Sequence, residues 1–315
     1  MKPGSQPQIT TLPLNSQLLL NSPGISCQSQ DHNQVHKVTG TFSPVPASFG
    51  GRRSVSTTPH PHEEIRRAIQ EEEWFLVYQP EIDLHHGSFV GVEALLRWRH
   101  PRRGVMIPAE FLPDIQAANK LLEVGRWVLA SACYQGADWH AKGYRFSVAV
   151  NVSSQELDEP AFVDIVRDNL RVSRFTPRHL TLEFSLDALE SPRLPRLRQL
   201  ARLGVTLALD DVIPGTPPVA SLIEAGITEA KLNRQLVVDT LADDDSARAL
   251  HSFVTDSRAA GVRIVASGVE EESQRVSLIR EDVDSAQGFF FARPFEVDEV
   301  DRFLEDYALF SGRPL

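Results

Sequence analysis

The sequence is poor in features that mark several common protein classes. Among its 315 residues only two are cysteines, Cys27 and Cys133, too few for a disulfide framework or a cysteine-rich metal site. No apolar run approaches the roughly 18 residues that identify a membrane-spanning helix. The amino-terminal fragment Leu18–Leu20 is too short for the core of a signal peptide. We therefore expect a cytoplasmic protein with reduced thiols and no membrane span.

Positive charge and phosphate-binding motifs are also scarce. Lysine and arginine total 32 residues against 42 acidic residues, which gives a formal net charge of -10. Domains that bind a nucleic-acid polymer usually carry a basic face, so this balance argues against such a partner. Neither GxGxxG after an early strand nor GxxxxGK[ST] occurs, and this leaves dinucleotide-binding and P-loop folds without support.

The first 60 residues differ in composition from the rest. They are rich in Gln, Ser, Asn, Pro and Thr and show no sustained hydrophobic period. Such a segment buries too little apolar surface to offset the entropy lost on ordering, so we predict a disordered arm over 1–60. The basic pair at 52–53 and the SVSTTPHPH stretch after it are interpreted as linker, with a recognition or modification site as the alternative. A folded domain is predicted over 61–315.

Strand and helix patterns alternate through this second region. The predicted strands cover 74–80, 88–98, 145–153, 179–185, 205–211, 229–233, 263–268 and 284–292, and the two longest helical patterns cover 111–143 and 237–261. Gly143, Gly204, Gly226 and Gly261 stand where a helix should end in a left-handed glycine. The alternation implies a parallel sheet, open or closed, and about eight strands favour a (β/α)8 barrel. The first two strands, joined by LHHGS, are predicted to form an antiparallel hairpin.

Polar residues interrupt or end the apolar runs of the predicted strands. In a barrel, the carboxyl ends of the strands share the face on which active sites lie. The residues concerned are Glu93, Asn151, Glu183, Asp210, Asp211, Lys231, Glu270 and Gln287. Each alone also fits a local role, such as a turn or a helix cap. Together they predict a cation site, because clustered carboxylates repel one another and hard oxygen ligands suit Mg²⁺, Mn²⁺ or Ca²⁺. Adjacent aspartates can flank a metal pair that activates water for phosphodiester displacement.

With their neighbours, these residues resemble the EAL domain family, the phosphodiesterases that open cyclic di-GMP. The segment GVEALLRWRHP (91–101) is similar to the family signature. VAVNVSSQEL, LTLEF, LGVTLALDD, AKLNRQLV, VASGVEEESQ and AQGFFFARPF then follow in the family's order, so that the resemblance runs from about 63 to 310. It implies a (β/α)8-type barrel with an antiparallel first strand, in agreement with the alternation of strands and helices.

The resemblance implies that most of these polar residues surround metal. The positions that match family metal ligands or their immediate neighbours are Glu93, Asn151, Glu183, Asp210, Asp211, Glu270 and Gln287. Asp211 matches a ligand of the second metal ion. Mg²⁺ or Mn²⁺ is therefore the implied cofactor, if this chain binds metal at all.

Three further matches concern the substrate. Lys231 resembles the lysine that contacts the attacking water in the family, and Gln79 and Arg97 match positions that contact the dinucleotide. A guanidinium fork also suits a phosphate oxygen on chemical grounds alone. Cyclic di-GMP is therefore the implied ligand.

Departures from the family pattern fall at or beside the chemistry. Ser267 replaces the glutamate assigned to water activation in the family, and serine cannot accept a proton at neutral pH. Leu186 replaces a glutamate that tethers the loop after the Asp-Asp pair. That loop, 212–218, carries three prolines, which fix φ and remove hydrogen-bond donors. Asn233 replaces a carboxylate near the lysine.

These departures favour a regulatory protein of cyclic di-GMP signalling with a degenerate active site. It would bind cyclic di-GMP, an unidentified protein partner or both, with little or no hydrolysis, and Lys231 would be vestigial. The alternative is an active phosphodiesterase that yields pGpG with Mg²⁺ or Mn²⁺. Family members often dimerise near the Asp-Asp loop, and the altered loop leaves a homodimer open.

Overall fold

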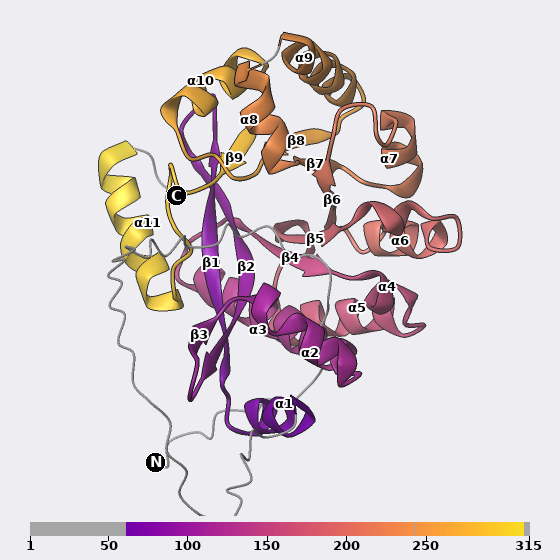
Figure 1. Ribbon diagram of the computed structural model, residues 1–315, viewed down its shortest axis with the longest axis vertical. Coiled ribbons are helices and arrows are strands. Elements are labelled where there is room, and N and C mark those ends of the chain that lie inside the picture. Colours follow the sequence, from indigo (N-terminus) through magenta and orange to yellow (C-terminus); the bar gives the residue numbers. More distant parts are fainter. Residues whose placement is uncertain (1–60, 243, 312–315) are drawn as a thin grey trace, which may run out of the picture.

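A computed structural model of the chain describes residues 61–242 and 244–311. Within these ranges, helices surround a single sheet whose strands run through the middle of the molecule (Figure 1). The predicted disordered arm and Cys27 lie outside the described residues. Cys133 is buried and free, and burial raises the pKa of its thiol to about 12, as suits an inert core residue.

The strands of the described region close into a barrel. They are β1 (Trp74–Asp83), β2 (Phe89–His100), β3 (Gly104–Met106), β4 (Ser147–Val152), β5 (Leu180–Phe184), β6 (Thr206–Val212), β7 (Glu229–Leu232), β8 (Arg263–Ala266) and β9 (Ser285–Gln287). Their order is β1-β9-β8-β7-β6-β5-β4-β2-β3, and a further pairing of β1 with β2 completes the ring. β2 and β4 to β9 run parallel, whereas β1 is antiparallel to both of its neighbours. The predicted barrel with an antiparallel first strand is therefore confirmed.

Helices cover the outside of the strands; in Figure 1, α8, α9 and α10 lie at the top and α6 and α7 at the right. The α-helices are α1 (Pro61–Gln70), α2 (Leu112–Ala117), α3 (Leu121–Ala141), α4 (Ser154–Asp158), α5 (Phe162–Ser173), α6 (Leu194–Ala201), α7 (Val219–Ala225), α8 (Arg234–Ala242), α9 (Asp244–Ala259), α10 (Glu272–Arg280) and α11 (Val297–Ser311). Short 3₁₀ turns are η1 (Pro108–Glu110), η2 (Pro177–His179) and η3 (Leu186–Leu189). None of the helices in the described ranges is long and apolar enough to cross a membrane.

The two longest predicted helices are wrong, because the structure has two helices in place of each. Over 111–143 the chain forms α2 and α3, and between them Asn119 has φ 54°. A left-handed residue cannot continue a right-handed helix, so the break is local and steric. Over 237–261 the structure has α8, which begins earlier, and α9. Asp244 and Asp245 lie in the first turn of α9, where carboxylates favour a helix start over a helix interior.

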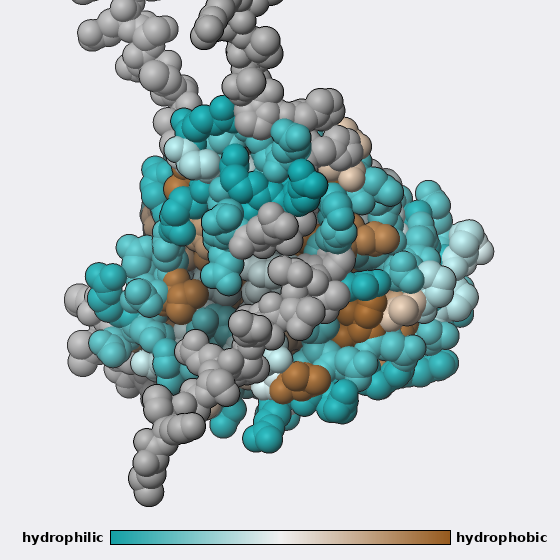
Figure 2. All heavy atoms as spheres, turned by 90° about the horizontal axis from the view of Figure 1, so that it is seen from below, coloured by the Kyte–Doolittle hydropathy of each residue, from teal (hydrophilic) through white to brown (hydrophobic). Residues whose placement is uncertain are grey.

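The helix ends agree with the sequence prediction more closely than the helix lengths do. The four glycines predicted at helix ends all have positive φ, from 75° to 100°. Edge-to-face aromatic pairs hold the β1–β2 hairpin against its neighbours. Tyr78 and Trp139 have ring centroids 4.8 Å apart, and Trp98 and Phe111 are 5.6 Å apart. The face in Figure 2 is largely hydrophilic with separate apolar spots, as expected for helices that bury one side.

Candidate active site at the carboxyl mouth of the barrel

A buried polar cluster at the carboxyl ends of the parallel strands is centred on Lys231 of β7. Its Nζ atom lies 2.9 Å from Glu93 Oε2 and 2.7 and 2.8 Å from the two carboxylate oxygens of Glu183. The exposed fractions of these side chains are 3%, 8% and 2%. β2, β5 and β7 thus bring together residues that are up to 138 positions apart in the chain.

Two amide side chains complete the surroundings of Glu93. Asn151 of β4 donates from Nδ2 to Glu93 Oε1 at 2.8 Å, and Gln287 of β9 donates from Nε2 to Glu93 Oε2 at 2.6 Å. Asn151 Oδ1 is buried and accepts no hydrogen bond from the described residues. An orphaned buried oxygen is costly unless something binds it. With the oxygens of Glu93, Glu183 and Asp210, it is the type of hard donor that suits Mg²⁺ or Mn²⁺, but in the described part of the chain no group of three or more His, Cys, Asp or Glu side chains is arranged to hold a metal ion.

The charges of the cluster do not balance. Burial works against ionisation of Glu93, but Lys231 and the two amides outweigh it and lower the pKa of Glu93. Burial and repulsion from Glu93 raise the pKa of Glu183 well above its usual value. Asp210 is also buried, and desolvation raises its pKa despite attraction to Lys231. Burial disfavours the Lys231 ammonium, yet these carboxylates raise its pKa well above normal. The raised pKa values of Glu183 and Asp210 show what three ionised carboxylates around one ammonium would cost, and a divalent cation would favour their ionised forms.

Asp211 and Glu270, also predicted to surround metal, lie outside this cluster. Asp211 is exposed with φ 60°, at the point where the pairing of β6 with β7 shifts register, and its carboxylate accepts a hydrogen bond from Asn233. Glu270 is exposed and pairs with Arg234 at 2.6 Å. The predicted metal set therefore divides into a buried group and two rim carboxylates that already have partners. The sequence reasoning missed Arg234, for which the only signal was its place just after Lys231.

The two predicted ligand-contacting residues lie on the same inner face of the barrel as Glu93. Gln79 is opposite Glu93 in the β1–β2 pair, so both side chains share the inner face of the barrel. Arg97 lies four residues beyond Glu93 on β2, again on this face because strand side chains alternate. Arg97 is 8% exposed, and its Nη1 donates to the Leu96 carbonyl oxygen at 2.7 Å. Burial lowers its pKa against attraction to Glu93. Among the described residues, no carboxylate forms an ion pair with this guanidinium.

The positions that depart from the family pattern border the same mouth. Ser267 follows β8, and its buried Oγ has no hydrogen-bond partner in the described part of the chain. Leu186 begins η3 and is 47% exposed, so it supplies an apolar surface where, by the resemblance, the family has a tethering glutamate. In the loop 212–218 at the end of β6, Thr216 N donates to Ile213 O at 3.1 Å, and the Thr216–Pro217 peptide is cis.

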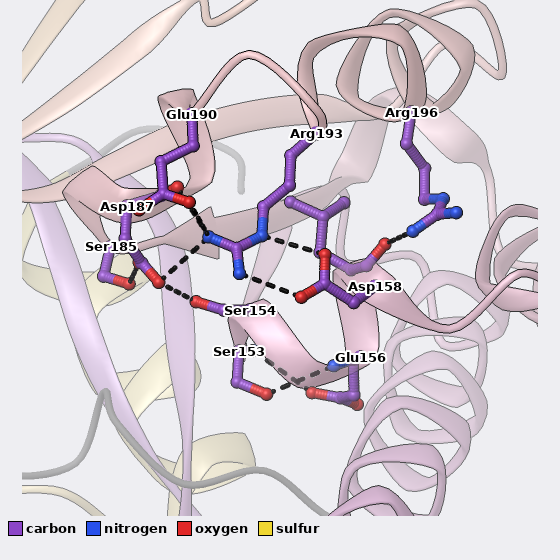
Figure 3. Close-up of polar contacts among 10 residues, drawn as sticks. Ser153, Ser154, Glu156, Asp158, Ser185, Asp187, Glu190, Arg193 and Arg196 are labelled. Atoms are coloured by element: carbon purple, nitrogen blue, oxygen red, sulfur yellow. Dashed lines mark hydrogen bonds and ion pairs between the residues drawn. The ribbon is translucent and has the colours of Figure 1, made fainter.

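A polar network that the sequence reasoning missed ties the loop after β5 to α4 (Figure 3). Asp187 accepts hydrogen bonds from the hydroxyls of Ser185 and Ser154, and from Arg193 Nη1 at 3.3 Å. Arg193 also donates to both carboxylate oxygens of Asp158, at 2.9 and 2.8 Å. The loops that follow Asn151 and Glu183 are therefore linked to each other. No sequence motif predicts this network, because its members come from separate segments of the chain.

Fold and cluster together define a class: a barrel with an antiparallel first strand, and with buried carboxylates, amides and a lysine at its carboxyl mouth. The family comparison makes the class specific. The chain belongs to the EAL domain family, whose model matches residues 62–294, and the resemblance seen in the sequence is confirmed.

Two similar curated proteins come from Pseudomonas aeruginosa. One is the bifunctional diguanylate cyclase/cyclic di-GMP phosphodiesterase MucR, 33% identical over 241 residues that cover 75% of this chain and 35% of MucR. The other is the cyclic di-GMP phosphodiesterase NbdA, 31% identical over 257 residues that cover 80% of this chain and 33% of NbdA. The chain thus spans about a third of the length of these relatives.

Solved structures show the same architecture. The PaMucR phosphodiesterase in complex with c-di-GMP is 33% identical, has a TM-score of 0.72, and covers 76% of this chain and 99% of its own. The FimX EAL domain from Pseudomonas aeruginosa bound to c-di-GMP is 22% identical, with a TM-score of 0.67 and coverage of 75% and 97%. The second likeness supports the fold alone.

Proposed function

We propose that this chain acts in cyclic di-GMP signalling as a regulatory EAL domain that binds cyclic di-GMP with little or no hydrolysis. The observation that carries the proposal is Arg97, a buried guanidinium with no carboxylate partner in the described residues, beside the cluster at the mouth. A phosphate oxygen would give this guanidinium the counter-charge it lacks. The PaMucR structure, at 33% identity, is named as a c-di-GMP complex.

The serine at position 267 supports the proposal of little or no turnover. Ser267 stands where the resemblance places the glutamate that activates water, and a hydroxyl does not accept a proton at neutral pH. Lys231 is a donor held by Glu93 and Glu183, and its raised pKa keeps it protonated. Loss of a well-placed base typically slows a reaction by about 10²- to 10⁴-fold.

A metal ion, if bound, would be held by Glu93, Asn151, Glu183 and Asp210. It would supply charge neutralisation for a phosphodiester oxygen. Binding of a nucleotide through Arg97 and Gln79 does not require that chemistry, so recognition and hydrolysis are separable in this arrangement.

The product assay tests the absence of turnover. Purified protein is incubated with cyclic di-GMP and Mn²⁺, and the products are separated by chromatography. We expect no pGpG above the protein-free background. Steady formation of pGpG would establish the alternative, an active phosphodiesterase, which is favoured by the intact lysine and carboxylates and by relatives named as phosphodiesterases.

Titration calorimetry tests the binding. We expect cyclic di-GMP to bind the wild type, Arg97→Gln to weaken binding by about tenfold or more, and Glu93→Ala to weaken ligand or metal binding. Arg99→Gln is the matched control, because Arg99 lies on the same strand but is exposed and paired with Glu296 at 3.0 Å. If the wild type binds no cyclic di-GMP, the regulatory role would rest on a protein partner, and a search for that partner, including a second copy of this chain, becomes the next step.

A further inference from the structure

A second polar site lies inside the barrel at the opposite, amino-terminal mouth. A cavity of about 320 Å³ opens there between the starts of the parallel strands and the end of β1. Its polar lining includes Glu81, Glu229, Arg263, Ser147, Thr181 and Thr206. The volume falls at the lower end of the range of about 300 to 1,000 Å³ that is typical of small-molecule pockets.

Two carboxylates share one guanidinium at the wall of this cavity. Arg263 donates from Nη1 to Glu229 Oε2 at 2.7 Å, and from Nη2 to Glu81 Oε1 and to Ser285 Oγ, the latter at 2.6 Å. The Ser285 hydroxyl donates to the same Glu81 oxygen. In the described ranges, no donor is bonded to the second oxygen of either carboxylate. When both carboxylates are ionised, the group therefore carries one negative charge more than its single cation offsets.

Burial makes that excess charge costly. The exposed fractions of the Glu229 and Glu81 side chains are 8% and 14%. Burial and then repulsion from Glu81 raise the pKa of Glu229 to about 7, against attraction to Arg263 and, more weakly, to Lys231. Lys231 lies two residues along β7 on the same face, but it is bonded to Glu93 and Glu183 at the other mouth. A cation in the cavity would offset the surplus.

We propose that this cavity binds a small organic cation: a primary ammonium group on a short chain that carries a second polar group. The ammonium would contact the free oxygens of Glu229 and Glu81, since it has three donors and these oxygens are acceptors. The polar chain would lie against the hydroxyls of Thr181, Thr206 and Ser147. This site is independent of the function proposed for the carboxyl mouth.

Other small ligands fit this cavity less well. An anion would meet two carboxylates and a guanidinium that is already bonded to both. Mg²⁺ demands near-octahedral oxygen coordination, and the two carboxylates of the cavity lining, Glu81 and Glu229, are both already bonded to Arg263. An ammonium needs no such geometry.

The test uses 1,4-diaminobutane as the probe and 1,4-butanediol as its neutral isostere, with calorimetry on the full chain at pH 8. We expect saturable binding of the diamine and none of the diol. Glu229→Gln should weaken diamine binding by about tenfold or more, and Thr206→Val by a few-fold. Glu73→Gln is the matched control, because Glu73 is also ion-paired and only 11% exposed but lies outside the cavity, and it should leave the affinity unchanged.

Two outcomes would overturn the proposal. One is the absence of saturable diamine binding to the wild type up to about 10 mM, which is weaker than a useful small-ligand site. The other is equal affinity in the wild type and Glu229→Gln. Thermal unfolding checks that each variant is folded. If Glu229→Gln does not fold, Thr206→Val carries the test, because Thr206 takes part in no ion pair, and an unchanged affinity there overturns the assignment.

Discussion

Replacing Lys231 with methionine tests the cluster at the carboxyl mouth most directly. The substitution removes the ammonium but keeps an unbranched side chain. Three contacts of 2.7 to 2.9 Å are lost, and Glu93 and Glu183 remain buried without a counter-charge. Removal of one partner from a buried ion pair typically costs about 3–5 kcal/mol. We expect Lys231→Met to lower the free energy of unfolding by this amount at pH 7, a large part of the usual total of about 5–15 kcal/mol.

Urea denaturation, followed by tryptophan fluorescence, measures this change. Lys142→Met is the matched control, because Lys142 also contacts two carboxylates, Asp301 at 2.7 Å and Asp138 at 3.1 Å, but is 41% exposed. Exposed pairs typically contribute less than about 1 kcal/mol. A similar small loss in both variants would refute the reasoning, since the buried contacts of Lys231 would then contribute no more than an exposed ion pair does.

Metal ions extend the same experiment. If Glu93, Glu183, Asn151 and Asp210 hold a divalent cation, Mn²⁺ should restore part of the stability that Lys231→Met loses. A ligand that binds only the folded state adds about 2.7 kcal/mol when its concentration is 100 times its Kd. Glu93→Gln in the Lys231→Met background should abolish this recovery. Recovery that persists without Glu93 would mean that the ion binds elsewhere.

Three further predictions concern other parts of the barrel. Between pH 4.5 and about 7 the folded state keeps a proton on Glu229 that the unfolded state releases. The free energy of unfolding of the wild type should therefore fall with rising pH in this window, by up to about 3 kcal/mol relative to that of Glu229→Gln. Denaturation of both proteins at several pH values measures this difference. Arg193→Gln should lower the free energy of unfolding by about 1–3 kcal/mol, because it leaves Asp187 without its guanidinium partner. An unchanged thermal midpoint would contradict the network in Figure 3. Gly136→Ala should lower the free energy of unfolding by about 1–3 kcal/mol, since a Cβ there would lie 2.7 Å from ring carbons of Phe175. Equal urea midpoints in the variant and the wild type would contradict this close approach.

The barrel could be predicted from the sequence because turns and glycines at helix ends mark where its strands begin. Each predicted parallel strand follows a turn or a helix-ending glycine, and a strand of the structure overlaps each of the eight predicted segments, although β1, β2 and β6 extend beyond the predicted ends. β3 was missed because three residues are too few to show an alternating pattern. The break at Asn119 was missed for another reason: the apolar pattern continues across it, and only the backbone angle reveals the end of α2.

The candidate site could be predicted only as far as barrel geometry determines it. Glu93, Glu183 and Lys231 meet because the carboxyl ends of parallel strands converge, and this follows from the strand assignment alone. The position of Asp211 does not follow, since a positive φ at the end of β6 places it outside the buried cluster. Arg263 and its two carboxylates carry no motif, and only the register of the strands brings them together.

The two ends of the barrel are coupled through β7. Glu229 and Lys231 lie two residues apart on one face, roughly 7 Å along the strand, and the positive charge of Lys231 lowers the pKa of Glu229. A divalent cation bound at the carboxyl mouth would add to that positive field, and a cation in the opposite cavity would then be repelled. Because coupling between binding sites is reciprocal, each cation should weaken the other by the same factor. Diamine affinities measured with and without Mn²⁺ should therefore differ in the wild type. In Glu93→Gln, which weakens the metal site, the difference should shrink.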